Sequence, residues 1–283
     1  MRHSFAKYFL TYFAMLLLPL LAGCDDGDYE SIDSPKELDG FIRSAQMNGL
    51  KNRWNSIEAY PRLTVEEYAN FREVTTTGMG EHVLFRSSSP VDPSIGRSHY
   101  ADSLAKEAGI KGFINLADTQ MDLDSSSDFK KTYYSTQKYV CAQMTMDFMS
   151  QTNRERIAWA IYFIMGNDGP YLIHCVEGKD RTGFLVAVLE ALMGATLDEI
   201  KEDYVKSFSN FYNAPNGIQI PLTDEEKGWF ADVVVENLKI AFELESLDKV
   251  SLSDAAFSYL RRIGFSEQEI SRLRYHLKAN RGR

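Results

Sequence analysis

One short segment of the chain brings together residue types that can carry out nucleophilic chemistry on an anion. Residues 174–183 read His-Cys-Val-Glu-Gly-Lys-Asp-Arg-Thr-Gly. Cys175 supplies a thiol, and Arg181 supplies a planar guanidinium fork that matches two oxygens of a phosphate group. The hydroxyl of Thr182 can donate to the sulfur and so favour its departure as a thiolate.

The neighbouring residues place this segment between a strand and a helix. The apolar run 170–174 is typical of a buried strand, a loop follows from Cys175 to Arg181, and a helix is expected from about Thr182. Such a loop is suited to binding anions, because its N–H groups and the helix dipole present positive charge. The same field favours the thiolate form of Cys175.

Two further side chains of the segment have expected roles. Lys179 places a second positive charge at the rim of the loop, which would suit substrates that carry more than one phosphate. His174 ends the strand, where its ring can orient the loop through hydrogen bonds.

Short apolar runs and helical patterns alternate along the chain, which predicts an α/β fold with helices on a central, mostly parallel sheet of four or five strands. The expected strands are 82–86, 111–116, 138–143 and 170–174. Helices are expected at 64–71, 98–108 and 153–165, followed by additional C-terminal helices at 183–193, 196–211, 224–242, 253–263 and 266–278. Capping boxes mark several starts, such as Thr196 followed by Glu199 and Ser266 followed by Glu269.

The spacing C-x5-R-T resembles the signature loop of the cysteine-dependent protein tyrosine phosphatases. The full string resembles a bacterial group of that family with dual and triple specificity, including activity on phosphoinositides. Residues 85–88, Phe-Arg-Ser-Ser, are similar to the end of an early strand in that group, and residues 259–274 are similar to its C-terminal tail. One departure is Asn115-Leu116-Ala117-Asp118, where the relatives read Asp-Leu-Arg.

The resemblance implies a reaction through a phosphocysteine intermediate, with Cys175 as nucleophile and Arg181 holding the phosphate. The implied phosphate-binding residues are Val176, Glu177, Gly178, Lys179, Asp180, Arg181 and Thr182. His174 and Arg86 would support the loop, and Arg86 could either reach the pocket or pair with an acidic residue.

The family's general acid is an Asp on a loop upstream of the cysteine. Asp147 lies 28 residues before Cys175 and fits that position best. Asp180, inside the loop, and Asp118, at the end of another predicted strand, remain alternatives.

Several functions share this loop chemistry. The leading hypothesis is a phosphatase of phosphotyrosine proteins or phosphoinositides. Alternatives are an inositol-phosphate phosphatase and a phosphate-binding module without turnover; a sulfur-transfer or arsenate-reducing enzyme is the weakest. No cofactor or metal is expected, because the sequence holds no His, Asp and Glu cluster with ligand spacing.

Composition narrows the partners further. The 283 residues include 31 basic and 40 acidic side chains, for a net charge of −9, which argues against a nucleic-acid partner. The three cysteines exclude a disulfide framework. Cys141 is expected either as a core residue or as a thiol that pairs with Cys175 on oxidation.

The N-terminus has the pattern of an export signal. Residues 1–23 combine Arg2 and Lys7 with an apolar stretch that is short for a membrane span. The following Leu-Ala-Gly-Cys resembles the lipobox of bacterial lipoproteins, in which Cys24 would carry the lipid. We expect an acidic tether at 24–35 and one phosphatase domain at 36–283, anchored through Cys24 to a membrane of the bacterial cell envelope, on the periplasmic or surface side.

Aromatic residues are frequent in the helical segment 196–245, which a Pro-Gly-containing break at 213–217 divides. Phe208, Phe211, Tyr212 and Trp229 are among them. In the resembling bacterial group, helices at this position cover the active site. The segment is therefore expected either to limit access to the pocket or to serve as ordinary core.

The lipoprotein hypothesis predicts that Cys24→Ser abolishes lipid attachment. Cells labelled with a palmitate analogue should show labelled wild-type protein and an unlabelled variant. Wild-type protein that is released in soluble form without label would contradict the hypothesis.

Overall fold

A computed structural model describes residues 63–211 and 222–278 of the chain. The expectations for the export signal, Cys24, the acidic tether, Tyr212 and the break at 213–217 lie outside these residues.

Five strands form the central sheet in the order β1-β2-β5-β3-β4. Their bounds are β1 (Arg72–Glu73), β2 (Leu84–Ser87), β3 (Gly112–Asn115), β4 (Lys138–Cys141) and β5 (Tyr171–His174). All neighbouring pairs are parallel except β1 and β2. This confirms the predicted α/β fold with a mostly parallel sheet, although β1 was not predicted, since two residues at an edge leave no periodic signal.

The strand register brings the carboxyl ends of the parallel strands into one line. Ser87 and Asn115 both align with His174, and Cys141 aligns with Asn115. The segments that leave these strands therefore meet at one edge, which is where ligands bind in open parallel sheets.

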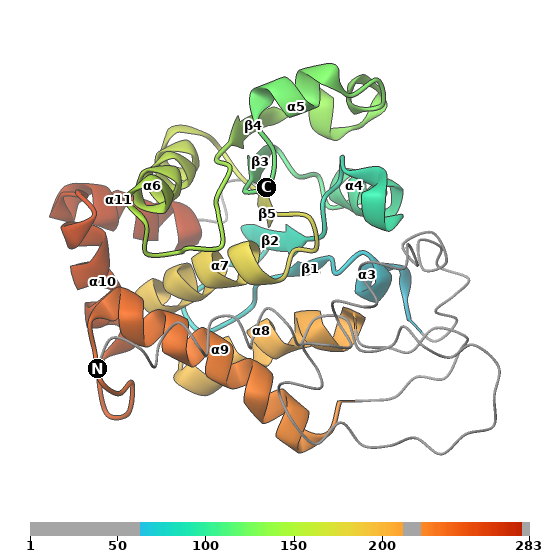
Figure 1. The fold of residues 1–283 in the computed structure, drawn as a ribbon. Helices are drawn as coiled ribbons and strands as arrows, with labels where there is room; N and C mark the ends of the chain where they lie inside the picture. The colour runs from blue at the N-terminus through green and yellow to red at the C-terminus, as the bar shows by residue number, and fades with distance from the viewer. Residues whose placement is uncertain (1–62, 212–221, 279–283) are drawn as a thin grey trace, which may run out of the picture.

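Helices cover both faces of this sheet (Figure 1). Those of the N-terminal half are α3 (Val65–Tyr68), α4 (Ser98–Glu107), α5 (Gln120–Ser125) and α6 (Gln151–Gly166). The C-terminal half contributes α7 (Asp180–Met193), α8 (Leu197–Phe211), α9 (Asp224–Phe242), α10 (Leu252–Arg262) and α11 (Glu267–Lys278). Short 3-10 turns occur at Pro93–Ile95, Phe129–Lys131 and Tyr134–Thr136.

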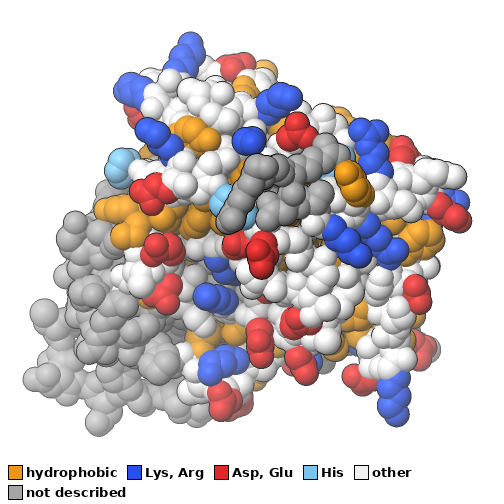
Figure 2. All heavy atoms as spheres, turned by 180° about the vertical axis from the view of Figure 1, so that it is seen from behind, with side chains coloured by type: hydrophobic (Ala, Val, Ile, Leu, Met, Phe, Trp, Pro, Cys, Tyr) orange, Lys and Arg blue, Asp and Glu red, His pale blue; other side chains and the backbone are white. Residues whose placement is uncertain are grey.

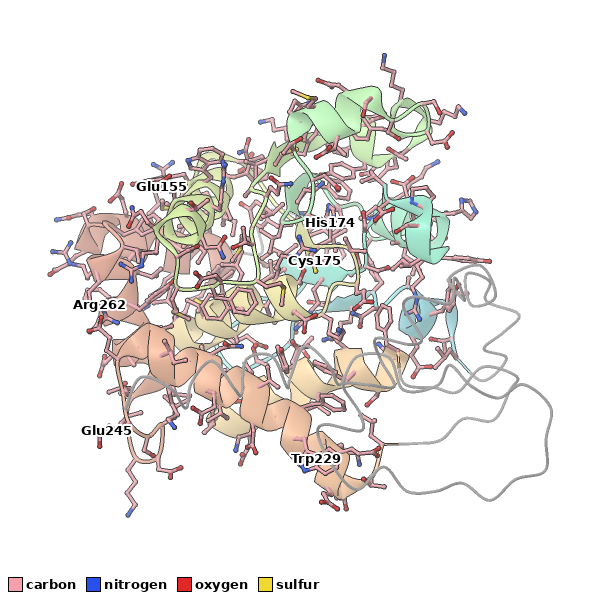
Figure 3. All side chains as sticks on the ribbon, viewed as in Figure 1. Glu155, His174, Cys175, Trp229, Glu245 and Arg262 are labelled. Carbon is pink, nitrogen blue, oxygen red and sulfur yellow. The ribbon has the colours of Figure 1, made fainter. Side chains whose placement is uncertain are left out.

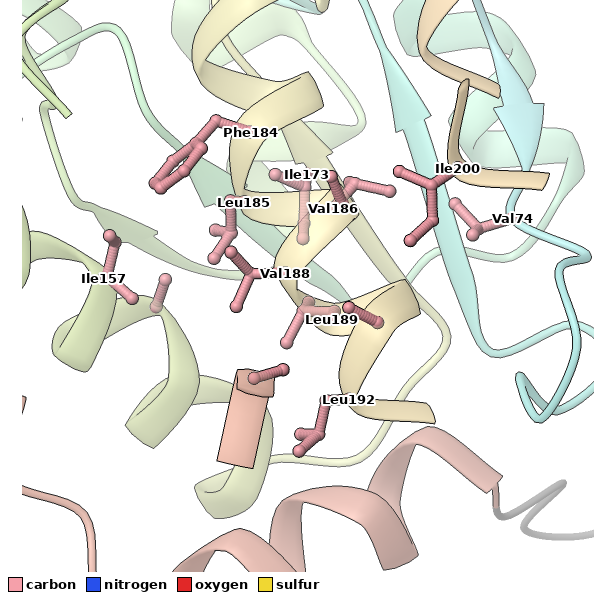
Figure 4. Close-up of a cluster of buried hydrophobic side chains, with 14 of the residues drawn as sticks. Val74, Ile157, Ile173, Phe184, Leu185, Val186, Val188, Leu189, Leu192 and Ile200 are labelled. Carbon is pink, nitrogen blue, oxygen red and sulfur yellow. The ribbon is translucent and has the colours of Figure 1, made fainter. Parts of the chain in front are cut away.

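Helix α7 lies at the centre of the larger core. Its residues from Thr182 to Met193 are all buried, as expected for a helix that is apolar on every side. Leu185 and Val188 lie among Ile157 of α6 and Ile173 of β5, and Ile200 of α8 packs nearby (Figure 4). A second cluster, which includes Leu172 of β5 and Leu104 of α4, fills the opposite face of the sheet.

The predicted helices agree with the structure within three residues, and one of these differences affects the site. Helix α7 begins at Asp180 rather than near Thr182, so Asp180 and Arg181 belong to its first turn. The connection after β5 therefore consists of residues 175–179, which we call the cysteine loop. The predicted capping boxes at Thr196 and Ser266 are both present.

Basic and acidic side chains are interspersed on the face seen in Figure 2. No helix within the described ranges is long and apolar enough to cross a membrane.

Candidate active site

The cysteine loop begins where β5 ends, and its thiol lies inside the molecule. Figure 3 shows His174 and Cys175 together at this point. Cys175 is only 3% exposed. Gly178 has φ +70°, and a Cβ on it would lie 2.0 Å from the carbonyl oxygen of Ser87. Glycine is therefore required for the loop to pass this close to β2.

Neighbouring segments hold the carbonyl groups of the cysteine loop from outside. The N–H of Ser89 donates to the carbonyl of Val176 at 2.9 Å. The side-chain amide of Asn70 donates to the carbonyl of Glu177 at 3.0 Å and to that of Gly178 at 3.3 Å.

Arg86 of β2 holds the end of the same loop. Its Nη2 donates to the carbonyls of Gly178 and Lys179 at 2.9 and 3.4 Å. The side chain is fully buried and also pairs with Asp203 of α8. Arg86 was expected either to reach the pocket or to pair with an acidic residue. In the structure it pairs with an acidic residue, Asp203.

These contacts determine where the N–H groups of the loop point. In a trans peptide, C=O and N–H point in opposite directions, so each carbonyl held outside turns the next N–H inward. The amides of residues 177–180 thus face away from Ser89, Asn70 and Arg86. At the start of α7, such an arrangement of N–H groups is suited to binding an anion, and we call it the cradle.

His174 extends the pattern by one residue. Its Nδ1 lies 3.4 Å from the carbonyl oxygen of Cys175, and its Nε2 lies 3.5 Å from the hydroxyl of Tyr134. Burial lowers the pKa of His174 to about 3, so the ring is neutral near pH 7. Because a carbonyl can only accept, the proton is on Nδ1, and Nε2 accepts from Tyr134. These contacts fit the expected role of His174 in orienting the loop, which stays a prediction.

Arg181 contacts the segments that follow β3 and β4. Its Nη1 donates to the carbonyl of Leu116 at 3.1 Å and to that of Met144 at 3.3 Å. These residues follow β3 and β4, so Nη1 lies at the edge where the two strands end. Within the described residues, no carboxylate forms an ion pair with Arg181.

Lys179 is located inside the molecule rather than at the rim. Its ammonium is fully buried and lies 2.8 Å from a carboxylate oxygen of Glu177 and 2.9 Å from one of Asp180. It also lies 5.0 Å from the ring centre of Phe208. Burial lowers the pKa of Lys179, but the two carboxylates outweigh this effect, so that the net shift is upward. In this structure the lysine charge is neutralised by its neighbours.

Asp147 lies on a segment that is fixed to α7 on either side of it. Met144 accepts the bond from Arg181, and the ring of Phe148 stacks on Phe184 with centroids 4.7 Å apart. The backbone carbonyl of Asp147 accepts a bond of 2.7 Å from Asn153, while its side chain is exposed.

Asp118 lies at the same edge of the sheet. Asn115 closes a turn by accepting from the N–H of Ala117 and Asp118, and its amide donates to the Asp118 carboxylate at 3.0 Å. Burial raises the pKa of Asp118, and the charge of Asp92 adds to that shift, although Asn115 and Arg181 oppose it. This turn replaces the Asp-Leu-Arg of the resembling group.

The Thr182 hydroxyl and the Cys141 thiol do not make the contacts with Cys175 that the sequence suggested. The hydroxyl of Thr182 is buried and has no hydrogen-bond partner among the described residues. Cys141 aligns with His174 across β3, so two strand spacings, about 9.5 Å, separate them. Cys141 also packs with the cluster on the other face of the sheet from Cys175. A Cys141–Cys175 disulfide therefore does not fit this backbone.

Burial raises the pKa of Cys141 to about 11, which leaves its thiol protonated near pH 7. Both cysteines are unpaired. This agrees with Cys141 as a packing residue rather than a resolving thiol.

The aromatic helices divide between two roles. Phe208 of α8 lies against Lys179 of the cysteine loop, and Phe230 of α9 stacks on Phe208 at 4.1 Å. The guanidinium carbon of Arg97 lies 3.6 Å from the ring centre of Phe211. Trp229 is 37% exposed and lies near the start of α9, away from Cys175 (Figure 3). Helix α8 therefore contacts the loop, whereas Trp229 does not lie over the thiol.

Asn70 and Ser89, which hold loop carbonyls, were not predicted from the sequence. Each lies outside any motif, and Asn70 was expected inside a helix; it instead has φ +50° after α3. Across the described residues, no group of three or more His, Cys, Asp or Glu side chains could hold a metal ion.

A parallel sheet with a buried thiol at the start of a loop that leads into a helix is an α/β arrangement suited to binding an anion beside a nucleophile. A family model described as a tyrosine phosphatase family matches residues 27–279. The protein therefore belongs to the tyrosine phosphatase family.

Among curated proteins, the chain is 33% identical over 179 residues to the triple specificity protein phosphatase PtpB of Mycobacterium tuberculosis. The match covers 59% of this chain and 60% of PtpB, so it spans less than two thirds of that relative. Among solved structures, the catalytic core of the PP-IP phosphatase SIW14 from S. cerevisiae is 21% identical, with a TM-score of 0.36, over 68% of this chain and 94% of that one. A second Siw14 catalytic-core structure is 23% identical, with a TM-score of 0.34, and covers 58% of this chain and 91% of that one.

The close approach of the loop to β2 predicts that Gly178→Ala impairs binding of anions. The added Cβ cannot remain 2.0 Å from the Ser87 oxygen, so the loop must move. A displacement of about 1 Å at a reacting centre can cost ~10²-fold in rate. We expect a loss of that size in kcat/KM for p-nitrophenyl phosphate.

Gly194→Ala is the matched control. Gly194 has φ +102° at the other end of α7, and a Cβ there meets nothing within 4 Å. It should lower the melting temperature without a comparable loss of kcat/KM. Equal kinetic effects of the two variants would contradict the role assigned to Gly178.

Proposed function

We propose that the protein is a cysteine-dependent phosphatase that hydrolyses phosphate monoesters through a phosphocysteine intermediate. The observation that carries this proposal is the cradle of inward N–H groups above the buried Cys175. Membership of the tyrosine phosphatase family supports it.

In the first step, the thiolate of Cys175 attacks phosphorus and the substrate oxygen departs. The inward N–H groups and Arg181 hold the three remaining phosphoryl oxygens as negative charge is redistributed among them. The carbonyls of Leu116 and Met144 hold one edge of the Arg181 guanidinium, so its orientation is set before substrate binds.

Asp147 is the proposed general acid. It protonates the departing oxygen, and in the second step it accepts a proton from the water that attacks the thiophosphate, releasing inorganic phosphate and the thiolate. The carboxylate of Asp147 is exposed, on a segment that contacts α7 through Met144 and Phe148, whereas the carboxylate of Asp180 is paired with Lys179. Asp118 remains the third candidate.

The proposed substrates are phosphotyrosine proteins, phosphoinositides or both. The name of the M. tuberculosis relative, a triple specificity protein phosphatase, supports a protein substrate. Lys179 would bind a second phosphate group of a substrate only if that group displaced Glu177 or Asp180 from the lysine ammonium. We further propose that the protein acts outside the cytoplasm, anchored to a membrane through a lipid on Cys24.

The proposed roles of Cys175 and Arg181 can be tested directly. Cys175→Ser should bind phosphorylated substrate without hydrolysing it, because a serine hydroxyl does not ionise at working pH. Arg181→Lys should also be severely impaired, because an ammonium cannot replace the planar fork. Turnover of p-nitrophenyl phosphate by Cys175→Ser within a few-fold of wild type would contradict the proposal, and binding without turnover by the wild type would indicate a phosphate-recognition module.

The acid can be assigned by comparing leaving groups. Asp147→Asn should lower kcat on phenyl phosphate by roughly 10²–10⁴-fold, the usual contribution of a general acid. The loss on p-nitrophenyl phosphate should be smaller, since p-nitrophenoxide departs more readily without a proton. The same pattern in Asp180→Asn or Asp118→Asn, but not in Asp147→Asn, would reassign the acid.

A further inference from the structure

One carboxylate on α8 holds both basic side chains of the β1–β2 hairpin. Asp203 accepts a bond from Nε of Arg72 at 2.7 Å, and its other oxygen pairs with Nη1 of Arg86. The side chain of Arg86 is fully buried, and those of Arg72 and Asp203 are each only 10% exposed. Neither Arg72 nor Asp203 belongs to any motif of the sequence.

Two chains of hydrogen bonds lead from Asp203 to the cysteine loop. The first passes through Arg86, which donates to the carbonyls of Gly178 and Lys179. The second passes through Arg72, whose Nη1 donates to the side-chain oxygen of Asn70 at 2.8 Å. The amide of Asn70 in turn donates to the loop carbonyls.

The rest of α8 strengthens the second chain. Nη2 of Arg72 donates to the backbone carbonyl of Asp203 at 2.6 Å and to the hydroxyl of Ser207 at 3.0 Å. One turn further on, the amide of Asn210 donates to the same oxygen of Asn70 at 3.0 Å. Thus α8 holds Arg72 and Asn70 from three positions, Asp203, Ser207 and Asn210, spaced one turn apart.

The charges around Asp203 explain why the two arginines stay in place. Burial raises the pKa of Asp203, but Arg72 and Arg86 outweigh it and lower the value to about 2. The nearby Glu190 of α7 has its pKa raised well above the usual range by burial and by the charge of Asp203. Both effects favour the neutral form of Glu190, and Asp203 is the carboxylate that pairs with the two guanidiniums.

The contact between α7 and α8 permits this arrangement. A Cβ on Gly183 would lie 2.5 Å from the ring of Tyr204, the residue after Asp203. The glycine in the first turns of α7 therefore lets α8 approach closely enough for Asp203 to reach Arg86.

We propose that Asp203 is a positioning residue of the cysteine loop and that α8 thereby sets the affinity of the loop for phosphate. The proposal rests on the proposed function, because it concerns the same cradle. Asp203 does not touch the substrate. It holds Arg86 and Arg72, which keep the loop carbonyls outside and the N–H groups inside.

The test measures anion binding and turnover in Asp203→Asn. Isothermal titration with tungstate, a phosphate-like oxyanion, reports on the cradle without requiring catalysis. Loss of charge-assisted hydrogen bonds to the arginines should weaken tungstate binding by about 10- to 100-fold. We expect KM for p-nitrophenyl phosphate to rise and kcat to fall in the same variant.

Asp198→Asn is the matched control on the same helix. The side chain of Asp198 is 87% exposed and lies 3.6 Å from Lys201, so this variant should leave tungstate binding and turnover unchanged. Thermal unfolding of each variant shows whether the protein remains folded.

A second variant keeps the proposal testable if Asp203→Asn does not fold. Asn70→Ala removes one chain of bonds and leaves the Asp203 pairs intact, and it should weaken tungstate binding. In Asn70→Ala/Asp203→Asn the combined loss should be smaller than the sum of the single losses, because Asp203 acts in part through Asn70.

The outcomes separate this proposal from the proposed function. A wild type that binds tungstate and hydrolyses p-nitrophenyl phosphate, with a folded Asp203→Asn that does both within twofold, would overturn the role of Asp203 alone. If Asp203→Asn is unfolded, unchanged tungstate binding by Asn70→Ala would overturn the role of Asp203. A wild type that does neither would overturn both proposals.

Discussion

The site depends on the outward orientation of a few carbonyl groups. A backbone cradle for an anion requires several consecutive N–H groups to point inward, and planar peptides permit this only if their carbonyls point outward. A buried carbonyl needs a donor. The N–H of Ser89, the amide of Asn70, the guanidinium of Arg86 and the ring of His174 supply these donors.

The rigidity of α7 gives this orientation a fixed reference. The helix carries Asp180 and Arg181 in its first turn and is buried among apolar side chains along the rest of its length. Close packing on all sides leaves the helix little freedom to shift. The thiol, the cradle and the arginine therefore keep their relative positions, which would lower the reorganisation needed in the proposed reaction.

The sequence predicted the parts of the site that are local and periodic. The strand ending at His174, the apolar helix after Arg181 and the residue types of the loop could be recognised because strand and helix periods are short-range signals. The residues that hold the loop from outside could not be recognised in this way. Asn70 and Asp203 lie 105 and 28 residues from Cys175 along the chain, and only the register of the sheet and the packing of α8 bring them together.

The burial of Lys179 could not be predicted from the sequence either, because tertiary contacts cause it. Its position beside Arg181 suggested an exposed charge for the substrate, but Glu177, Asp180 and the ring of Phe208 enclose it. A lysine that is paired in this way has a different function from one at an open rim, and the sequence alone does not distinguish the two.

The central claim is that backbone N–H groups of residues 176–180 bind the anion. The most direct measurement is an amide nitrogen–proton NMR titration of isotopically labelled Cys175→Ser with tungstate. The account predicts that the amide signals of these residues shift together and saturate with the binding curve, and that their exchange with solvent slows. Tungstate binding that leaves these amides unchanged and shifts signals elsewhere would contradict the account.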